Sequence, residues 1–167
     1  MHILYSKKEL IRLNNNESHN DAAPLIYETL EKHGEISFVS AGRSMLPVIR
    51  DGKDTVTVAK PRRDIKAGDV AFYQRDNGQF ILQRVMFVNG GTLVLRGDNQ
   101  WGNEYNVGKD RIIGVLKSFE RNGKKHSVRD RDYLLYVRVL PLIRFFRKYF
   151  YLFKSQVYKF VKYLVKR

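Results

Sequence analysis

The sequence predicts a mainly β fold: a coiled antiparallel sheet or partly closed barrel, with a short N-terminal helix and a C-terminal amphipathic helix. Hydrophobic residues alternate with a period of two in several short segments between residues 36 and 120. No helical segment separates these strands, so a layout of alternating strands and helices is disfavoured. A segment before the strands and another after them show helical spacing instead.

The first predicted element is a helix over residues 22–33. Leu25, Ile26, Thr29 and Leu30 recur at helical intervals, and Gly34 follows as a left-handed C-terminal cap. Residues 1 to about 20 form a polar lead-in, with a single helical turn expected around Leu10. The chain is therefore divided into a lead-in and helix (1–34), a β domain (35–128) and a basic amphipathic helix (129–167).

The strands follow in order, six or seven in all. They are expected around Ile36 and Phe38, around Val56 and Val58, and over residues 70–73, 79–88, 92–96 and 112–119, with a short return at 125–128. Asn89-Gly90-Gly91 adopts positive φ at low steric cost, which predicts a hairpin between residues 79–88 and 92–96. Asn122-Gly123 predicts a second tight turn.

Charge is distributed unevenly along the chain. The net charge is +14, but residues 1–120 hold 17 basic and 15 acidic side chains, whereas residues 121–167 hold 14 basic and 2 acidic ones. The chain has no cysteine, and its four histidines lack ligand spacing, so we expect no metal and no cofactor. The first residues lack the apolar stretch of roughly 7–15 residues of a secretory signal, which predicts a cytoplasmic protein.

The most informative block is residues 41–52, a glycine-flanked bend between two strands that contains Ser44-Met45-Leu46-Pro47. Gly68-Asp69-Val70, Gln83-Arg84 and Gly97-Asp98-Asn99 follow it in order. This series resembles the serine peptidase family shared by signal peptidases and self-cleaving repressors (the S24/S26 type). It is most similar to short members with a basic C-terminal tail, and the resemblance covers about residues 36–120. It implies a signal-peptidase-like β fold.

The resemblance also assigns roles to three residues. Ser44 matches the nucleophile, and Asp98 matches the aspartate that supports a histidine base. Gln83 stands where the family has that histidine, or a lysine, and an amide cannot take the hydroxyl proton near neutral pH. Its oxygen could still accept a hydrogen bond and hold the serine rotamer. Lys66, Lys109 and His126 are candidate substitute bases.

Some of these residues also have a purely structural interpretation. Gly97-Asp98-Asn99 suits an Asx turn, and Gly42, Pro47 and Gly52 shape the serine loop. Arg84 is expected at a strand edge or across a polar groove. Trp101 could line a peptide groove, although core or loop packing is favoured.

When residues 142–166 are drawn as one helix, the basic and the apolar side chains fall on opposite sides. Seven basic residues fall within an arc of roughly 140°, and aromatic and aliphatic residues fill the opposite arc. Residues 139–167 could pack on the protein, bind nucleic acid or lie on an anionic membrane surface. The wide aromatic arc favours the membrane surface, on the inner face, and the absence of a helix-turn-helix disfavours nucleic acid.

Three functions remain open at this point. The favoured one is a peptidase-like protein with impaired catalysis that acts on or binds a peptide at the membrane surface. The second is an active serine endopeptidase that uses another base. The third is a non-enzymatic regulator that binds DNA or a protein partner. The sequence does not indicate the substrate or the oligomeric state.

Overall fold

The computed structural model describes residues 4–5 and 19–165. The chain separates into two compact units, Met1–Val128 and Arg129–Arg167, each described here by itself. The first unit holds a β-sheet and the helix α2 (His19–His33), and the second holds the helix α3 (Arg131–Val165). The helical turn predicted around Leu10 lies outside the described residues.

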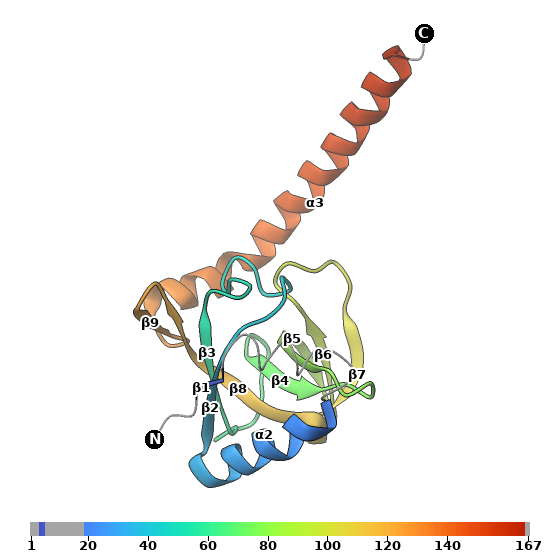
Figure 1. The fold of residues 1–167 in the computed structure, drawn as a ribbon. Helices are drawn as coiled ribbons and strands as arrows, with labels where there is room; N and C mark the ends of the chain where they lie inside the picture. Colours follow the sequence, from blue (N-terminus) through green and yellow to red (C-terminus); the bar gives the residue numbers. More distant parts are fainter. Residues whose placement is uncertain (1–3, 6–18, 166–167) are drawn as a thin grey trace. The chain divides into compact units, whose positions relative to one another are not determined.

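The sheet of the first unit is strongly curved (Figure 1). Its strands are β1 (Leu4–Tyr5), β2 (Glu35–Val39), β3 (Thr55–Ala59), β4 (Val70–Gln74), β5 (Phe80–Asn89), β6 (Thr92–Arg96), β7 (Glu104–Gly108), β8 (Ile112–Arg121) and β9 (Lys124–Ser127). Their order is β1-β2-β3-β8-β4-β5-β6-β7, with β9 paired to β8. Strands β2 to β9 pair antiparallel, whereas β1 runs parallel to β2.

The predicted antiparallel sheet is confirmed, but its partial closure into a barrel is not. Among the described strands, β1 and β7 lie at opposite ends of the order and do not pair with each other. β7 is poorly suited to closure, because Asn106 within it has φ of 57° and its register with β6 is interrupted. β7 was not predicted because Asn106 and Gly108 have low strand propensity, although Glu104–Gly108 alternates polar and apolar side chains.

Both predicted hairpins form. β5 and β6 are joined through Gly90 and Gly91, and Gly90 has φ of 56°. β8 and β9 are joined through Asn122 and Gly123, whose φ values of 51° and 76° are those of a type I′ turn. β8 is also the centre of the sheet, since it pairs with β3 along one part and with β4 along another.

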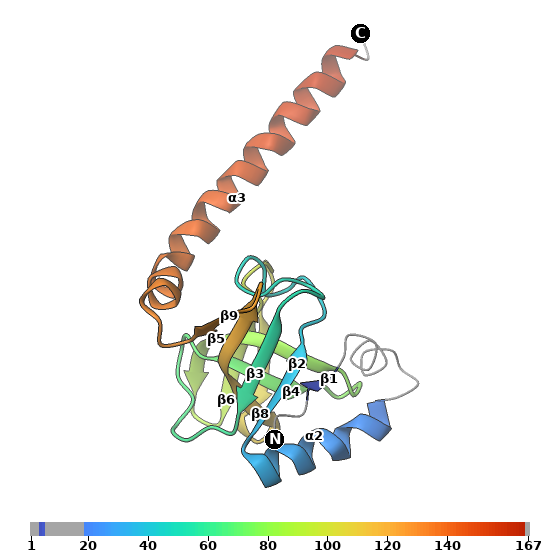
Figure 2. The ribbon, with the colours of Figure 1, turned by 60° about the vertical axis from the view of Figure 1, so that its left-hand side comes forward.

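Buried side chains fill the concave face of the sheet. One cluster consists of Ala71, Tyr73, Val85, Leu93, Leu95 and Val107. Phe38 and Phe72 add an aromatic contact, with ring centroids 5.1 Å apart. α2 lies beside β2 (Figure 2). It buries Ile26, Thr29 and Leu30, while Leu25 is exposed. Gly34 caps α2 as predicted, with φ of 72° and its N–H donating to the Leu30 carbonyl.

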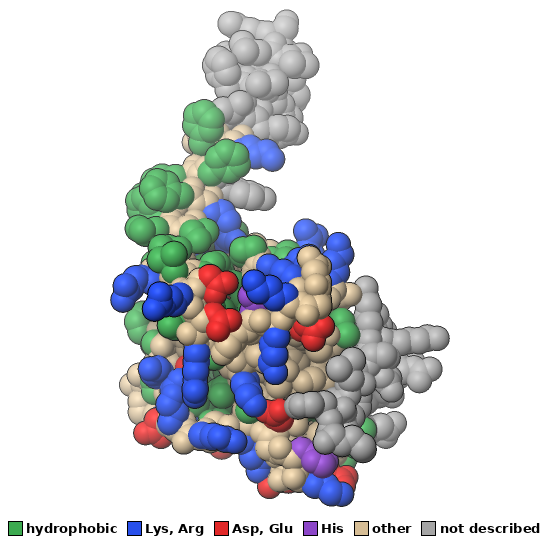
Figure 3. Space-filling model, turned by 90° about the vertical axis from the view of Figure 1, so that its left-hand side faces the viewer, with side chains coloured by type: hydrophobic (Ala, Val, Ile, Leu, Met, Phe, Trp, Pro, Cys, Tyr) green, Lys and Arg blue, Asp and Glu red, His purple; other side chains and the backbone are tan. Residues whose placement is uncertain are grey.

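The second unit is one helix with an exposed hydrophobic side. α3 begins at Arg131, well before Leu142, and contains Pro141, which cannot donate to the carbonyl four residues earlier. Hydrophobic side chains gather along it (Figure 3). Those with large exposure after Pro141 are Leu142, Ile143, Phe145, Phe146, Tyr149, Phe150 and Phe153. No helix of the described residues is long and apolar enough to cross a membrane.

Candidate functional site

The serine loop, residues 40–54, connects β2 to β3. Met45, Val48 and Ile49 are buried, so the loop is anchored by its apolar side chains. Ser44 is half-buried at the rim of a groove. Within the described residues its hydroxyl has no hydrogen-bond partner.

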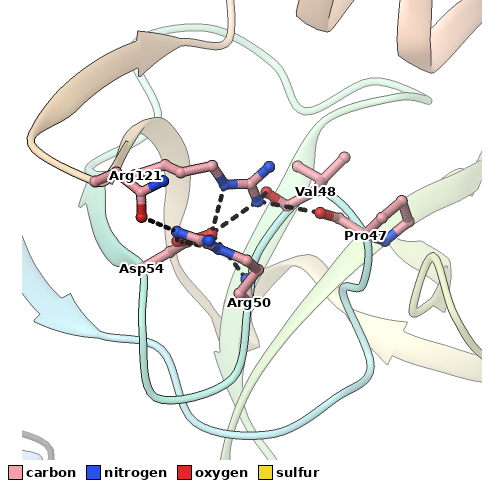
Figure 4. A network of polar contacts seen from close by, with 6 residues as sticks. Pro47, Val48, Arg50, Asp54 and Arg121 are labelled. Atoms are coloured by element: carbon pink, nitrogen blue, oxygen red, sulfur yellow. Dashed lines mark hydrogen bonds and ion pairs between the residues drawn. The ribbon is translucent and has the colours of Figure 1, made fainter.

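A buried carboxylate holds the end of this loop (Figure 4). Asp54 is fully buried and accepts from Arg50 Nε at 2.8 Å and from Arg121 Nη2 at 2.8 Å. Arg121 also donates to the carbonyls of Pro47 and Val48, at 3.1 and 2.7 Å. Burial alone would raise the pKa of Asp54, but the hydrogen bonds from Arg121 and Arg50 outweigh it, so the pKa lies below its usual value.

The Gly97-Asp98-Asn99 block supports the loop from the other side. The Asn99 backbone N–H donates to the Ser44 carbonyl at 2.7 Å, and Asn99 Nδ2 donates to the Arg43 carbonyl at 3.1 Å. A side chain at position 97 has no room, because its Cβ would lie 2.6 Å from the Ser44 carbonyl oxygen and 2.9 Å from Ser44 Cβ. Gly97, directly after β6, is therefore in close contact with Ser44.

Asp98 forms a buried ion pair with Arg84. Both side chains are almost fully buried, and the guanidinium donates through Nε to Oδ1 at 2.8 Å and through Nη2 to Oδ2 at 2.6 Å. Arg84 Nη1 also donates to the Gly68 carbonyl at 2.7 Å, which ties in the Gly68-Asp69-Val70 block. Arg84 thus lies between β4 and β6 inside the sheet, and its expected place at a strand edge is wrong.

Gln83 is buried, with 3% of its surface exposed. Both the oxygen and the nitrogen of its side-chain amide are hydrogen-bonded. Oε1 accepts from the Tyr73 hydroxyl at 3.2 Å, and Nε2 donates to Gln100 Oε1 at 3.0 Å. Gln100 Oε1 also accepts from the Gly97 N–H at 3.2 Å. Because a backbone N–H can only donate, it fixes the orientation of Gln100 and therefore that of Gln83. The Gln83 oxygen thus faces Tyr73, and the expected hydrogen bond from Ser44 to it is absent in the described structure.

Tyr73 does not replace the missing base. Burial and the neighbouring Glu104 carboxylate raise the pKa of its phenol, so the hydroxyl is neutral near pH 7. Burial alone would also raise the pKa of Glu104, but the hydrogen bonds from Arg75 outweigh it and lower the pKa. Arg75 Nε donates to both carboxylate oxygens of Glu104, at 2.9 and 3.0 Å.

The groove beside Ser44 has a volume of about 520 Å³. One wall is the serine loop from Ser40 to Met45, and the other is the stretch from Gln79 to Leu82, with Asn99 and Gln100 between them. Residues 80–82 of β5 pair with β4 on one side only, because β6 pairs with β5 from Arg84 onward. Among the described strands, an edge without a pairing partner therefore borders the groove.

A family comparison agrees with this geometry. The family model described as Peptidase S24-like matches residues 11–117, which include the serine loop, Gln83 and Asp98. The chain belongs to the Peptidase S24-like family. No curated protein matches the chain.

The lining of the groove beside Ser44 is known for the described residues of this S24-like chain. No lysine, histidine, aspartate or glutamate is among the described residues that line the groove. Lys66, Lys109 and His126 do not line it either: Lys66 begins the turn that ends at Asp69, Lys109 follows β7, and the His126 ring stacks on Phe119. Within the described residues, no group of three or more His, Cys, Asp or Glu side chains could hold a metal ion.

Two residues of the S24-like site were not found from the sequence. Gln100 links Gln83 to the backbone N–H of Gly97, and Tyr73 donates to the oxygen of the Gln83 amide. Gln100 follows directly after the Gly97-Asp98-Asn99 block, which was the available signal. Trp101 is 51% exposed and does not line the groove, so neither core packing nor a place in the peptide groove is confirmed for it.

Proposed function

We propose that this S24-like protein binds an extended peptide in the groove beside Ser44 and cleaves it very slowly or not at all. The observation that carries the proposal is the state of Gln83, whose amide is buried and hydrogen-bonded on both sides at the base position. We further propose that the chain is of the signal-peptidase type within the wider family.

Peptide binding is supported by the open edge of β5. An extended chain gains main-chain hydrogen bonds when it adds to an unpaired strand edge, and neighbouring pockets then select its side chains. Residues 80–82 offer such an edge, and the serine loop faces it across the groove. A bound strand would therefore place one of its carbonyl carbons beside Ser44.

Impaired cleavage follows from the chemistry of the amide. The attack of a serine hydroxyl requires a group that takes its proton and returns it to the leaving amine. General base catalysis contributes typically about 10²- to 10⁴-fold in rate, and nucleophile and base act as a unit. Since Gln83 turns its oxygen to Tyr73, its NH₂ points towards Gln100, and a donor cannot accept the proton.

Blocking the groove tests peptide binding. A library of acetylated and amidated octapeptides is passed over the immobilised protein, and the retained peptides are identified by mass spectrometry. Ala41→Trp should abolish retention, because the indole fills the groove. Ala67→Trp, in an exposed loop that does not line the groove, is the matched control. Equal retention by both variants and by the native chain would rule out this groove as the binding site.

A second proposal concerns α3, which we place on an anionic membrane surface at the inner leaflet. Seven large hydrophobic side chains of this helix are 42–69% exposed, and the basic residues Arg144, Arg147 and Lys154 lie on the other arc. Burial of the aromatic arc in the acyl boundary and attraction of the basic arc to anionic headgroups both favour this location.

Vesicle sedimentation tests the membrane proposal. The native chain should sediment with vesicles of phosphatidylcholine and phosphatidylglycerol, and less with phosphatidylcholine alone. Deletion of residues 139–167, or the pair Phe146→Ser and Phe150→Ser, should release it, whereas Phe87→Ser, an equally exposed phenylalanine of β5, should not. Unchanged sedimentation after the deletion would contradict the proposal. Binding to duplex DNA without binding to vesicles would favour the regulator interpretation.

A further inference from the structure

Arg43 is the charged side chain of the groove. Of the described residues that line the groove, it alone carries a formal charge, and it directly precedes Ser44. The other polar side chains there are hydroxyls or neutral amides: Ser40, Ser44, Gln79, Asn99 and Gln100. The groove wall therefore carries one positive charge, placed next to the position where a bound peptide meets the serine.

No carboxylate of the described residues neutralises this guanidinium. Arg43 is exposed, and its side chain forms no hydrogen bond or ion pair in the described structure. The two acidic residues of the serine loop have other partners: Asp51 accepts from the Gly42 N–H at 3.0 Å, and Asp54 binds Arg50 and Arg121. Asp98, which neighbours the loop through Asn99, pairs with Arg84. Arg50 and Arg121 bind Asp54, and Arg84 binds Asp98. The Arg43 guanidinium is therefore available to a ligand.

The backbone at Arg43 is held firmly. Its carbonyl accepts from Asn99 Nδ2 at 3.1 Å, and the next carbonyl accepts from the Asn99 N–H at 2.7 Å. Met45, two residues on, is buried. A guanidinium that extends from a fixed backbone loses less freedom when it binds a carboxylate, and Arg forms two parallel hydrogen bonds with that group.

We infer that the groove selects extended peptides that carry an aspartate or glutamate close to the residue opposite Ser44, and that Arg43 is the residue that determines this specificity. The inference rests on the proposed peptide binding and adds the substrate class. A lysine or arginine at the same peptide position is disfavoured, because it would meet a like charge in a partly enclosed groove.

Matched peptides test this inference by fluorescence anisotropy. A fluorescent octapeptide retained by the native chain is synthesised with Asp, Asn or Lys at each position in turn, always acetylated and amidated so that its termini are uncharged. At one position the Asp peptide should bind about threefold to tenfold more tightly than the Asn peptide, and the difference should shrink at high salt. The Lys peptide should bind more weakly than the Asn peptide.

Substitution at position 43 decides whether the arginine is responsible. Arg43→Gln should bring the Asp peptide to the affinity of the Asn peptide, and Arg43→Lys should retain part of the preference. Arg62→Gln, an exposed arginine outside the groove, is the matched control for net charge and should keep the full preference.

The outcomes separate the two proposals. Binding without an Asp-over-Asn difference, or with a difference that survives Arg43→Gln, overturns the specificity inference and leaves peptide binding in place. Retention of no peptide by the native chain overturns peptide binding itself, and the specificity inference with it.

Discussion

The serine loop and the base position border the same groove, but they are built differently. Ionic contacts and a tight backbone approach hold the loop: Asp54 binds two arginines at its end, and Gly97 touches Ser44. The base position is neutral, with the Gln83 amide between a phenol and a second amide. The loop that presents Ser44 is thus held by charged contacts, whereas the position of Gln83 is held by neutral hydrogen bonds.

The largest expected effect comes from breaking the buried ion pair between Asp98 and Arg84, which lies beside the serine loop. Asp98→Ala leaves Arg84 charged and buried without this partner, and should lower the free energy of unfolding by about 3–5 kcal/mol in urea denaturation. Asp76→Ala, which breaks an exposed pair with Arg111, should change it by less than about 1 kcal/mol. Similar losses in both variants would show that the Asp98 pair contributes no special support.

Acid should weaken the other end of the loop. The pKa of Asp54 is lowered in the folded state, so its contribution to stability is complete above the unfolded pKa and is lost as the pH falls through the folded value. Asp54→Asn should lower the free energy of unfolding by about 2 kcal/mol at pH 7. Between about pH 5 and 2 the native chain should lose stability more steeply than this variant. Parallel pH curves would contradict the assignment.

A smaller loss is expected at the contact between β6 and the serine. Gly97→Ala forces the Ser44 carbonyl away from a Cβ 2.6 Å distant and should cost about 1–3 kcal/mol, measured by thermal unfolding. Gly102→Ala, where nothing lies within 4 Å of the added Cβ, is the matched control. Equal unfolding temperatures for the two variants would show that the close contact at position 97 does not affect stability.

The amide network should give the smallest change. Gln83→Leu leaves the Tyr73 hydroxyl and the Gln100 oxygen short of a partner in a buried place, and should cost about 1–2 kcal/mol. Gln79→Leu, at a half-buried position of the groove wall, is the control. A stabilised Gln83→Leu protein would show that the network is dispensable for the fold.

The strands and the turns were largely predictable, because period-two alternation and the Asn-Gly and Gly-Gly pairs are local signals. Asn122 and Gly123 show this well, since both adopt the positive φ that the dipeptide favours. β7 was missed because Asn106 and Gly108 have low strand propensity within a segment of five residues. The open edges of the sheet depend on long-range pairing that no local pattern encodes.

The site was predictable in its residues and not in its contacts. Ser44, Gln83 and Asp98 were singled out from motif order, but the pairing of Asp98 with Arg84 depends on strand register across β5 and β6. The orientation of the Gln83 amide depends on a chain of hydrogen bonds that begins at the backbone of Gly97. The spacing of residues along the chain does not encode these contacts.

We propose that Gln83 leaves Ser44 without a base. The most direct test of this proposal is cleavage of a peptide library, followed by mass spectrometry, with the native chain, Ser44→Ala, Gln83→His and Gln83→Lys. We expect the native chain and Ser44→Ala to give the same product profile, and a Gln83 variant with an imidazole or amine to show Ser44-dependent cleavage. Robust cleavage by the native chain that disappears in Ser44→Ala would contradict the claim.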